Sequence, residues 1–225
     1  MNIKQASVII GFSTAIFAVS SVQASVIVNG TFDNNTSGWT GSYTAQPGGA
    51  GGFPTIDTGS YYWGGNNASN NITQIYNLTS SDLNSLSGLG LDFSISADLF
   101  GFSSQNDHSI FKASFYSGAS ASGSLLGSVA LDSAMNDPGT WASVFTSGDF
   151  PNFQTQTGAI SSLTNSILFT VESIRLEGFS NDGYADNLNF SLNPVTTVPV
   201  PVPATVWLLG SGLIGLIGMR KKSKL

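Results

Sequence analysis

Few side chains in this sequence are suited to catalysis. Its 225 residues include one histidine, His108, and no cysteine, which excludes disulfides, thiolate metal sites and cysteine nucleophiles. His108 has no nucleophile motif beside it, and glycoside hydrolysis requires two carboxylates about 5 to 10 Å apart. The 13 acidic residues are scattered and cannot be paired from the sequence. We therefore predict no catalytic residue and a protein that is not an enzyme, with a secreted glycan hydrolase as a distant alternative.

A run of three aromatic residues is the best local candidate for binding. Tyr61, Tyr62 and Trp63 precede two glycines and the amides Asn66 and Asn67. Glycans bind to exposed aromatic rings flanked by polar groups of this kind. Side chains alternate between the two faces of a strand, so at least one of these aromatics belongs to the core. With that restriction, the run is predicted as a glycan-binding platform.

The body of the chain is strongly acidic. Residues 25–197 contain all 13 acids and only Lys112 and Arg175 as basic residues, which gives a net charge of −11. Phosphate backbones repel such a surface, so nucleic acid is excluded as a partner. An acidic surface attracts divalent cations, but more simply it keeps an exported protein soluble.

The same region has the pattern of an all-β domain. Apolar and polar residues alternate in Leu91–Leu99 and in Leu188–Leu192, and Gly/Ser/Asn-rich segments separate the runs. The expected strands are Val26–Val28, Ile72–Leu78, Leu91–Leu99, Ser109–Tyr116, Leu125–Leu131, Thr140–Phe145, Ser166–Leu176 and Ala185–Leu192. We predict a single jelly-roll-like β-sandwich over residues 25–193, with Trp39 and Trp141 in its core.

The N-terminus has the features of an export signal. Lys4 precedes an apolar stretch, and small residues follow up to Val22-Gln23-Ala24. A charged start, an apolar centre and a small-residue end define a secretory signal peptide. We predict a signal peptide over residues 1–24, with the Sec translocon and signal peptidase as partners. The alternative is an uncleaved membrane anchor.

The C-terminus has the features of a membrane anchor. Residues 204–219 carry no charge and span about 24 Å as a helix, somewhat less than a hydrocarbon core of about 30 Å. We predict a transmembrane helix there. The basic tail at 220–225 places this end in the cytoplasm. Residues 194–203, rich in proline and valine, are expected to form an extended linker.

Three features combine at this end of the chain. They are a proline-rich motif (Val200, Pro201, Val202, Pro203 and Ala204), a glycine-rich apolar segment and a basic cluster (Arg220, Lys221 and Lys222). Together they resemble the PEP-CTERM sorting domain in its VPLPA variant, with Val202 in place of leucine. The resemblance implies recognition by an exosortase, a membrane-embedded cysteine protease or transpeptidase of Gram-negative bacteria. It also implies a transient inner-membrane anchor before delivery to the cell surface, outer envelope or extracellular matrix.

Both ends of the body carry a second resemblance. Asn29–Asp33 and Asp182–Leu192 resemble the first and last strands of galactose-binding-like and carbohydrate-binding β-sandwich modules. In such modules two acidic residues often meet around a structural calcium ion, which Asp33 and Asp186 would hold here. No other cofactor is expected. The alternative is that Asp33 starts a turn and Asp186 bonds backbone amides.

These features predict an exported, non-enzymatic protein of the cell surface or extracellular matrix, associated with exopolysaccharide or biofilm and sorted by an exosortase-like system. The alternative is a carbohydrate-binding module with structural calcium, for which exopolysaccharide is the natural ligand. Saturable affinity for a polysaccharide distinguishes such a module from a structural protein that only self-associates.

Overall fold

The computed structural model describes residues 24–35, 37–47, 59–102, 105–133 and 152–196. Contacts group Ser21–Val195 into one compact unit, to which every helix and strand below belongs. The predicted signal peptide (apart from Ala24), the sorting motif, the membrane helix, the basic tail and the strand expected at Thr140–Phe145 lie outside the described residues. None of the described residues forms a helix with the length and hydropathy of a membrane span.

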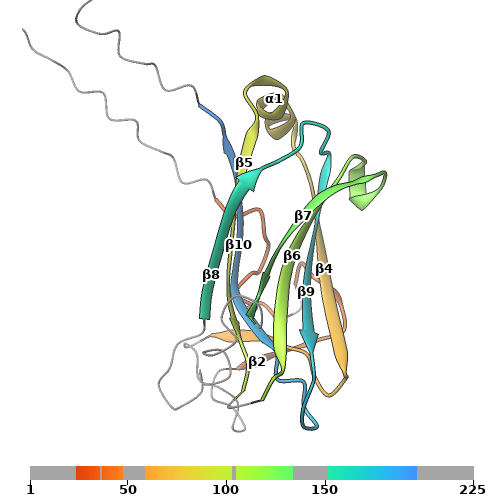
Figure 1. The fold of residues 1–225 in the computed structure, drawn as a ribbon, viewed down its shortest axis with the longest axis vertical. Coiled ribbons are helices and arrows are strands. Elements are labelled where there is room, and N and C mark those ends of the chain that lie inside the picture. Colours follow the sequence, from red (N-terminus) through yellow and green to blue (C-terminus); the bar gives the residue numbers. More distant parts are fainter. Residues whose placement is uncertain (1–23, 36, 48–58, 103–104, 134–151, 197–225) are drawn as a thin grey trace, which may run out of the picture. The chain divides into compact units, whose positions relative to one another are not determined.

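Two antiparallel sheets of five strands form a β-sandwich (Figure 1). Sheet A has the strand order β1-β4-β9-β6-β7, and sheet B has the order β2-β3-β10-β5-β8. The elements are β1 (Thr40–Gly41), β2 (Thr44–Pro47), β3 (Ser60–Trp63), β4 (Ser69–Asn77), α1 (Ser80–Gly88), β5 (Leu91–Phe100), β6 (His108–Tyr116), the 3-10 turn η2 (Ala119–Ala121), β7 (Leu125–Asp132), β8 (Asn152–Ala159), β9 (Ser166–Ile174) and β10 (Tyr184–Pro194). The prediction of an all-β sandwich is confirmed.

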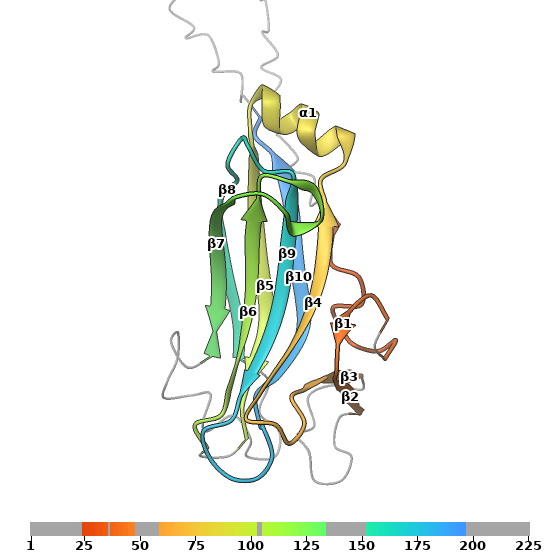
Figure 2. The ribbon, with the colours of Figure 1, turned by 90° about the vertical axis from the view of Figure 1, so that its right-hand side faces the viewer.

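The chain passes from one sheet to the other at most connections. Among the described strands, only the β2–β3 and β6–β7 connections remain within a sheet. Strands β3 to β10 therefore follow the order of a jelly roll, with β3-β10-β5-β8 facing β4-β9-β6-β7. Figure 2 shows the strands of sheet A in front of those of sheet B.

Alternation gives β5 and β10 one apolar and one polar face. On β5, Phe93 and Ile95 are buried and Asp92 is exposed. Phe190 of β10 lies opposite Ile95, and its ring stacks on Phe93 with centroids 5.5 Å apart. Burying one such side chain contributes roughly 1.5–3 kcal/mol. These inward faces form the core that holds the two sheets together.

The N-terminal motif forms an irregular segment, so the expectation of a strand at Val26–Val28 is wrong. Its backbone does run beside β10, since Val26 N donates to Phe190 O at 2.8 Å. The chain then leaves the extended conformation at Asn29, where φ is +54°. A regular ladder therefore cannot continue past this residue.

Gly30 lies against the backbone of β10 so closely that a side chain does not fit. Leu188 N donates to Gly30 O at 3.0 Å, and a Cβ on Gly30 would lie 2.1 Å from Leu188 O. Only glycine fits such a contact. Beyond it, Phe32 and Trp39 are buried with ring centroids 5.8 Å apart, which confirms Trp39 as a core residue.

Two longer elements were not expected from the sequence. α1 lies at one end of the sandwich (Figure 2) and starts with a capping box. In this box Thr79 Oγ1 accepts from Asp82 N at 3.2 Å, and Asp82 Oδ2 accepts from Thr79 N at 2.8 Å. β8 was missed because its inward residues, among them Gln154, are polar, so it lacks apolar alternation.

Gly30→Ala is expected to destabilise the domain by about 1–3 kcal/mol or more, because the new methyl group overlaps a backbone carbonyl. Gly88→Ala is the matched control. Apart from the backbone of α1 and the neighbouring residues, no atom lies within 4 Å of a Cβ at Gly88, the last residue of α1. Alanine there should therefore stabilise by up to about 1 kcal/mol. Urea denaturation measures both values. Equal effects of the two substitutions would contradict the proposed contact.

Candidate functional site

The predicted aromatic platform lies on β3, where successive side chains face opposite sides of sheet B. Tyr62 points into the core, and its hydroxyl donates to the Asn70 carbonyl at 3.1 Å. Tyr61 and Trp63 lie on the outer face of sheet B. Tyr61 has only 1% of its surface exposed. Neither tyrosine can therefore act as an exposed platform, and a role for the half-buried Trp63 stays a prediction.

Tyr61 is buried because it belongs to a second aromatic cluster, on the outer face. Tyr184 of β10 and Phe100 of β5 lie with ring centroids 5.3 and 5.4 Å from its own. Trp63 and Phe102 border this cluster and are half-buried. The sequence did not reveal the cluster, because its members come from three strands that meet only in the folded sheet.

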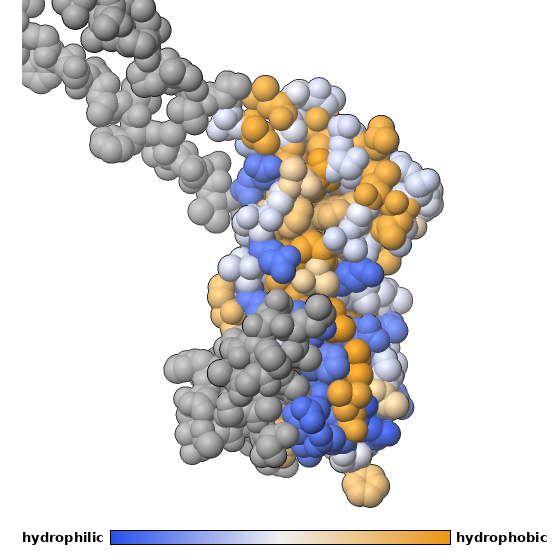
Figure 3. All heavy atoms as spheres, in the orientation of Figure 1, coloured by the Kyte–Doolittle hydropathy of each residue, from blue (hydrophilic) through white to orange (hydrophobic). Residues whose placement is uncertain are grey.

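A buried carboxylate, Asp107, shapes the loop that joins β9 to β10. Its oxygens accept from the backbone N–H groups of Leu176, Glu177 and Asp182 at 2.6, 2.9 and 2.9 Å. Hydrogen bonds to a charged acceptor are among the strong ones. They hold the loop in one conformation at an end of the sandwich where hydrophilic residues gather (Figure 3).

Asp182 and Tyr184 form a buried acid–phenol pair in this region. Tyr184 Oη donates to Asp182 Oδ1 at 2.6 Å. Burial raises the pKa of Asp182 above its ordinary value of 3.8, the hydrogen bond from Tyr184 opposes this rise, and the charge of Asp107 adds to it. Burial also raises the pKa of the Tyr184 hydroxyl, which therefore remains a hydrogen-bond donor.

The rest of the outer face of sheet B carries hydroxyl, amide and carboxylate groups. Three rows of side chains cross β10, β5 and β8: Asn189–Ser96–Thr155, Ser191–Ser94–Thr157 and Asn193–Asp92–Ala159. Asp92, Thr155 and Thr157 are exposed, whereas Ser96 and Ser191 are buried. This face therefore offers many hydrogen-bonding groups along neighbouring strands.

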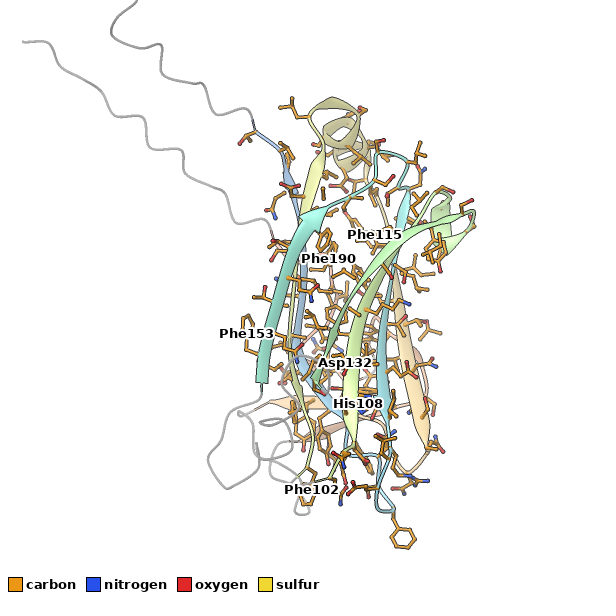
Figure 4. All side chains as sticks on the ribbon, viewed as in Figure 1. Phe102, His108, Phe115, Asp132, Phe153 and Phe190 are labelled. Carbon is orange, nitrogen blue, oxygen red and sulfur yellow. The ribbon has the colours of Figure 1, made fainter. Side chains whose placement is uncertain are left out.

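Phe153 adds an exposed aromatic ring to this face. It lies opposite Asp98 of β5, 62% of its surface is exposed, and its ring points away from the interior (Figure 4). Asn187 Nδ2 donates to Asp98 Oδ2 at 2.8 Å. The register of β10 against β5 shifts between Asp186 and Asn189, so β10 has a bulge there, and Asn187 within it has φ +51°. A bulge of this kind changes the direction in which a side chain points. We call Phe153, Asp98 and Asn187 the Phe153 site.

Sheet B carries negative charge only. Its described strands contain Asp92, Asp98 and Asp186 and no lysine or arginine, whereas sheet A includes Lys112 on β6. An anionic ligand is therefore repelled from the Phe153 site, and a neutral one is not.

Asp33 and Asp186, the predicted calcium ligands, both lie near the start of β3. Asp33 Oδ1 accepts from Ser60 N at 3.0 Å. Burial raises the pKa of Tyr61, and the charges of Asp182 and Asp186 add to this rise. Asp186 is buried, and its Oδ1 accepts from Asn187 N at 2.7 Å. Among the described residues, no three acidic or histidine side chains form a group suited to a metal ion. Calcium binding stays a prediction.

Comparison with protein families identifies a sorting signal at the C-terminus. Residues 199–222 match the PEP-CTERM protein-sorting motif, so the resemblance inferred from Val200–Ala204 and the basic cluster is confirmed. The chain is thus an exported protein, sorted to the cell surface or the extracellular space by an exosortase-type system. The match covers the sorting segment and not the β-sandwich.

The β-sandwich is similar to several solved structures. For family 16 carbohydrate-binding module-2, the TM-score is 0.48 at 15% identity, with 74% of this chain and 99% of that chain covered. For the enzymatically active domain of tailspike protein 4 of bacteriophage CBA120, the TM-score is 0.46 at 13% identity, with 75% and 21% covered. For the CBM22-1–GH10 modules of Clostridium thermocellum xylanase 10B, complexed with xylohexaose, the TM-score is 0.41 at 12% identity, with 81% and 31% covered. The chain thus spans a minor part of the last two proteins. Comparison with curated proteins finds no match.

Asp182→Asn is expected to stabilise the domain at neutral pH. The raised pKa of Asp182 means that its charged carboxylate disfavours folding. The stability that the protonated carboxyl provides is therefore complete at a pH below the ordinary pKa of aspartate. It is lost as the pH rises through the raised pKa of the folded state. Asparagine keeps an oxygen for Tyr184 without the charge. Urea denaturation should show a gain over the wild type at neutral pH that vanishes in acid. A loss of stability at neutral pH would contradict this account, and Asp92→Asn, at an exposed position, is the control.

Proposed function

We propose that this chain is a non-enzymatic protein of the cell surface or extracellular matrix whose β-sandwich binds a neutral polysaccharide of the surrounding exopolysaccharide. The observation that carries the proposal is the Phe153 site, an exposed ring beside a carboxylate and an amide. The PEP-CTERM motif supports the location.

Each part of the Phe153 site suits one part of a sugar. The C–H face of a pyranose ring is apolar and lies flat against an aromatic ring such as that of Phe153. The Asp98 carboxylate accepts hydrogen bonds from sugar hydroxyls, and the Asn187 amide both donates and accepts. The serine and threonine rows extend the same surface along β5 and β8. Several units of one polymer can therefore contact the sheet together.

Charge restricts the class of polysaccharide. Uronate-rich or sulfated polymers would bring negative charge beside Asp92 and Asp98, and the strands of sheet B offer no basic side chain to pair with it. Repulsion between like charges at short range costs binding free energy. The proposed ligand is therefore a neutral polysaccharide.

The acids of this face favour binding over hydrolysis. Asp98 and Asp186 lie opposite each other across β5 and β10. Asn187 donates its side-chain amide to Asp98 and its backbone N–H to Asp186. Asn187 thus bonds to both acids, and we assign them to ligand binding rather than to hydrolysis, which needs one protonated carboxyl as general acid. Release of reducing sugars that disappears in Asp98→Asn would contradict the proposal.

Phe153→Ala is expected to weaken polysaccharide binding about tenfold, which corresponds to roughly 1.4 kcal/mol. Affinity electrophoresis in hydroxyethylcellulose, dextran and galactomannan measures the change, with alginate as an anionic polymer that should not bind. Phe179→Ala is the matched control, because Phe179 is 92% exposed but lies in the β9–β10 loop and not on a strand of sheet B. Equal losses in the two variants, or tighter binding of alginate than of the neutral polymers, would contradict the proposed site.

Replacing both Pro201 and Pro203 with alanine is expected to block sorting, because the resemblance places them in the recognition motif. The full-length precursor should then accumulate in the inner membrane, with at least about a tenfold loss from the cell surface or medium. Fractionation and mass spectrometry of an exosortase-bearing host measure this. Pro194→Ala, outside the motif, is the control. Normal release of the double variant would exclude exosortase-type processing through this motif.

A further inference from the structure

The described strands leave four sheet edges, and three of them are protected. β1 has two residues, and β2 has four and ends in Pro47. A short edge strand or a proline limits pairing with another chain. The two remaining edges are β7 and β8, which lie on the same side of the sandwich (Figure 2).

The β7 edge is covered by side chains from β8. Gln154 Nε2 donates to the Asp132 carbonyl at 3.3 Å, and Gln156 Nε2 donates to the Ala130 carbonyl at 3.5 Å. These bonds occupy acceptors of β7 that would otherwise be open to another strand. They also explain why the inward residues of β8 are polar.

The β8 edge has no comparable protection among the described residues. Ile160 N donates to Leu91 O at 2.9 Å, and alternate residues of an antiparallel strand bond to the same neighbour. The even-numbered residues of β8 therefore bond to β5. The backbone groups of Phe153, Thr155 and Thr157 therefore point away from β5, to the side where no described strand pairs with β8. This eight-residue strand contains no proline and no charged residue.

We infer that β8 pairs antiparallel with β8 of a second copy of this chain, so that the two sheets B join. The acidic body repels its copies, but this strand carries no charge and so adds no repulsion at the contact. A pair centred on Thr155 places each Thr155 opposite its copy and each Phe153 opposite the partner strand's threonine at position 157. Thr–Thr and aromatic–β-branched pairs both stabilise adjacent strands. The edge is therefore complementary to itself.

The pairing goes beyond the proposed function and does not depend on it. If both hold, the dimer brings two Phe153 sites onto one continuous sheet face. A polymer that contacts both sites then binds by avidity rather than by one weak contact.

Cysteine cross-linking tests the register directly, because the natural chain has no cysteine. Residues opposite each other in a hydrogen-bonded antiparallel pair have Cα atoms about 5.5 Å apart, within the disulfide range of about 4.4–6.8 Å. The full-length Thr155→Cys chain, purified in detergent and mildly oxidised, should form a covalent dimer. Ile75→Cys is the control, since Ile75 is 46% exposed on β4, an inner strand of sheet A. Equal cross-linking of both variants, or none at position 155, would overturn the inference.

A charge on the edge provides a second test. Thr155→Lys should weaken self-association at least tenfold in sedimentation experiments, because two lysines would meet at the centre of the pair. Thr73→Lys on β4 changes the net charge equally and should leave self-association unchanged. Circular dichroism checks that both variants fold. An identical mass distribution of both variants and the wild type would overturn the inference. Binding of hydroxyethylcellulose by the wild-type chain at dilutions where sedimentation shows a monomer would separate a failed pairing from a failed glycan site, because no residue of the binding face is changed.

Discussion

Strand β10 connects the parts of this domain that are farthest apart in the sequence. It pairs with β3 and β5 and also bonds to the N-terminal segment at Leu188 and Phe190. Side chains alternate along β10, so one set forms the core and the other set lies on the outer face of sheet B. The same division holds for β5. The polar outer face of sheet B thus follows from the way in which the core is built. The bulge at Asn187 then places an amide beside Asp98.

Local patterns in the sequence predicted much of this architecture. β4, β5, β6, β7, β9 and β10 coincide with expected runs to within a few residues, because most of them bury one face and alternate accordingly. The sorting motif could also be predicted, since its parts are contiguous in the sequence. β8 could not be predicted, because it lacks alternating apolar residues: its inward side chains Gln154 and Gln156 bond to carbonyls of β7 instead of filling the core with apolar atoms. α1 is short, but its capping box at Thr79 and Asp82 was a usable signal.

The candidate site was harder to predict than the fold, because it depends on cross-strand register. Tyr61 looked like part of a platform, but neighbours from β5 and β10 bury it. Phe153 is the exposed ring instead. It can be recognised as part of a site only once the pairing of β8 with β5 places it opposite Asp98. The same strand provides the sheet edge that we propose for self-pairing, where no described strand lies. Export, a hydrogen-bonding face suited to a neutral polymer and a self-complementary edge together describe a component suited to a polysaccharide matrix.

The central claim is that the outer face of sheet B contacts a neutral polysaccharide. Backbone amide chemical shifts of the exported protein, titrated with a soluble neutral oligosaccharide such as cellohexaose, test it most directly. The account predicts saturable shifts confined to the outward residues of β5, β8 and β10, centred on Asp98, Phe153 and Asn187. Saturable shifts on sheet A or on the β9–β10 loop, with sheet B unchanged, would contradict it.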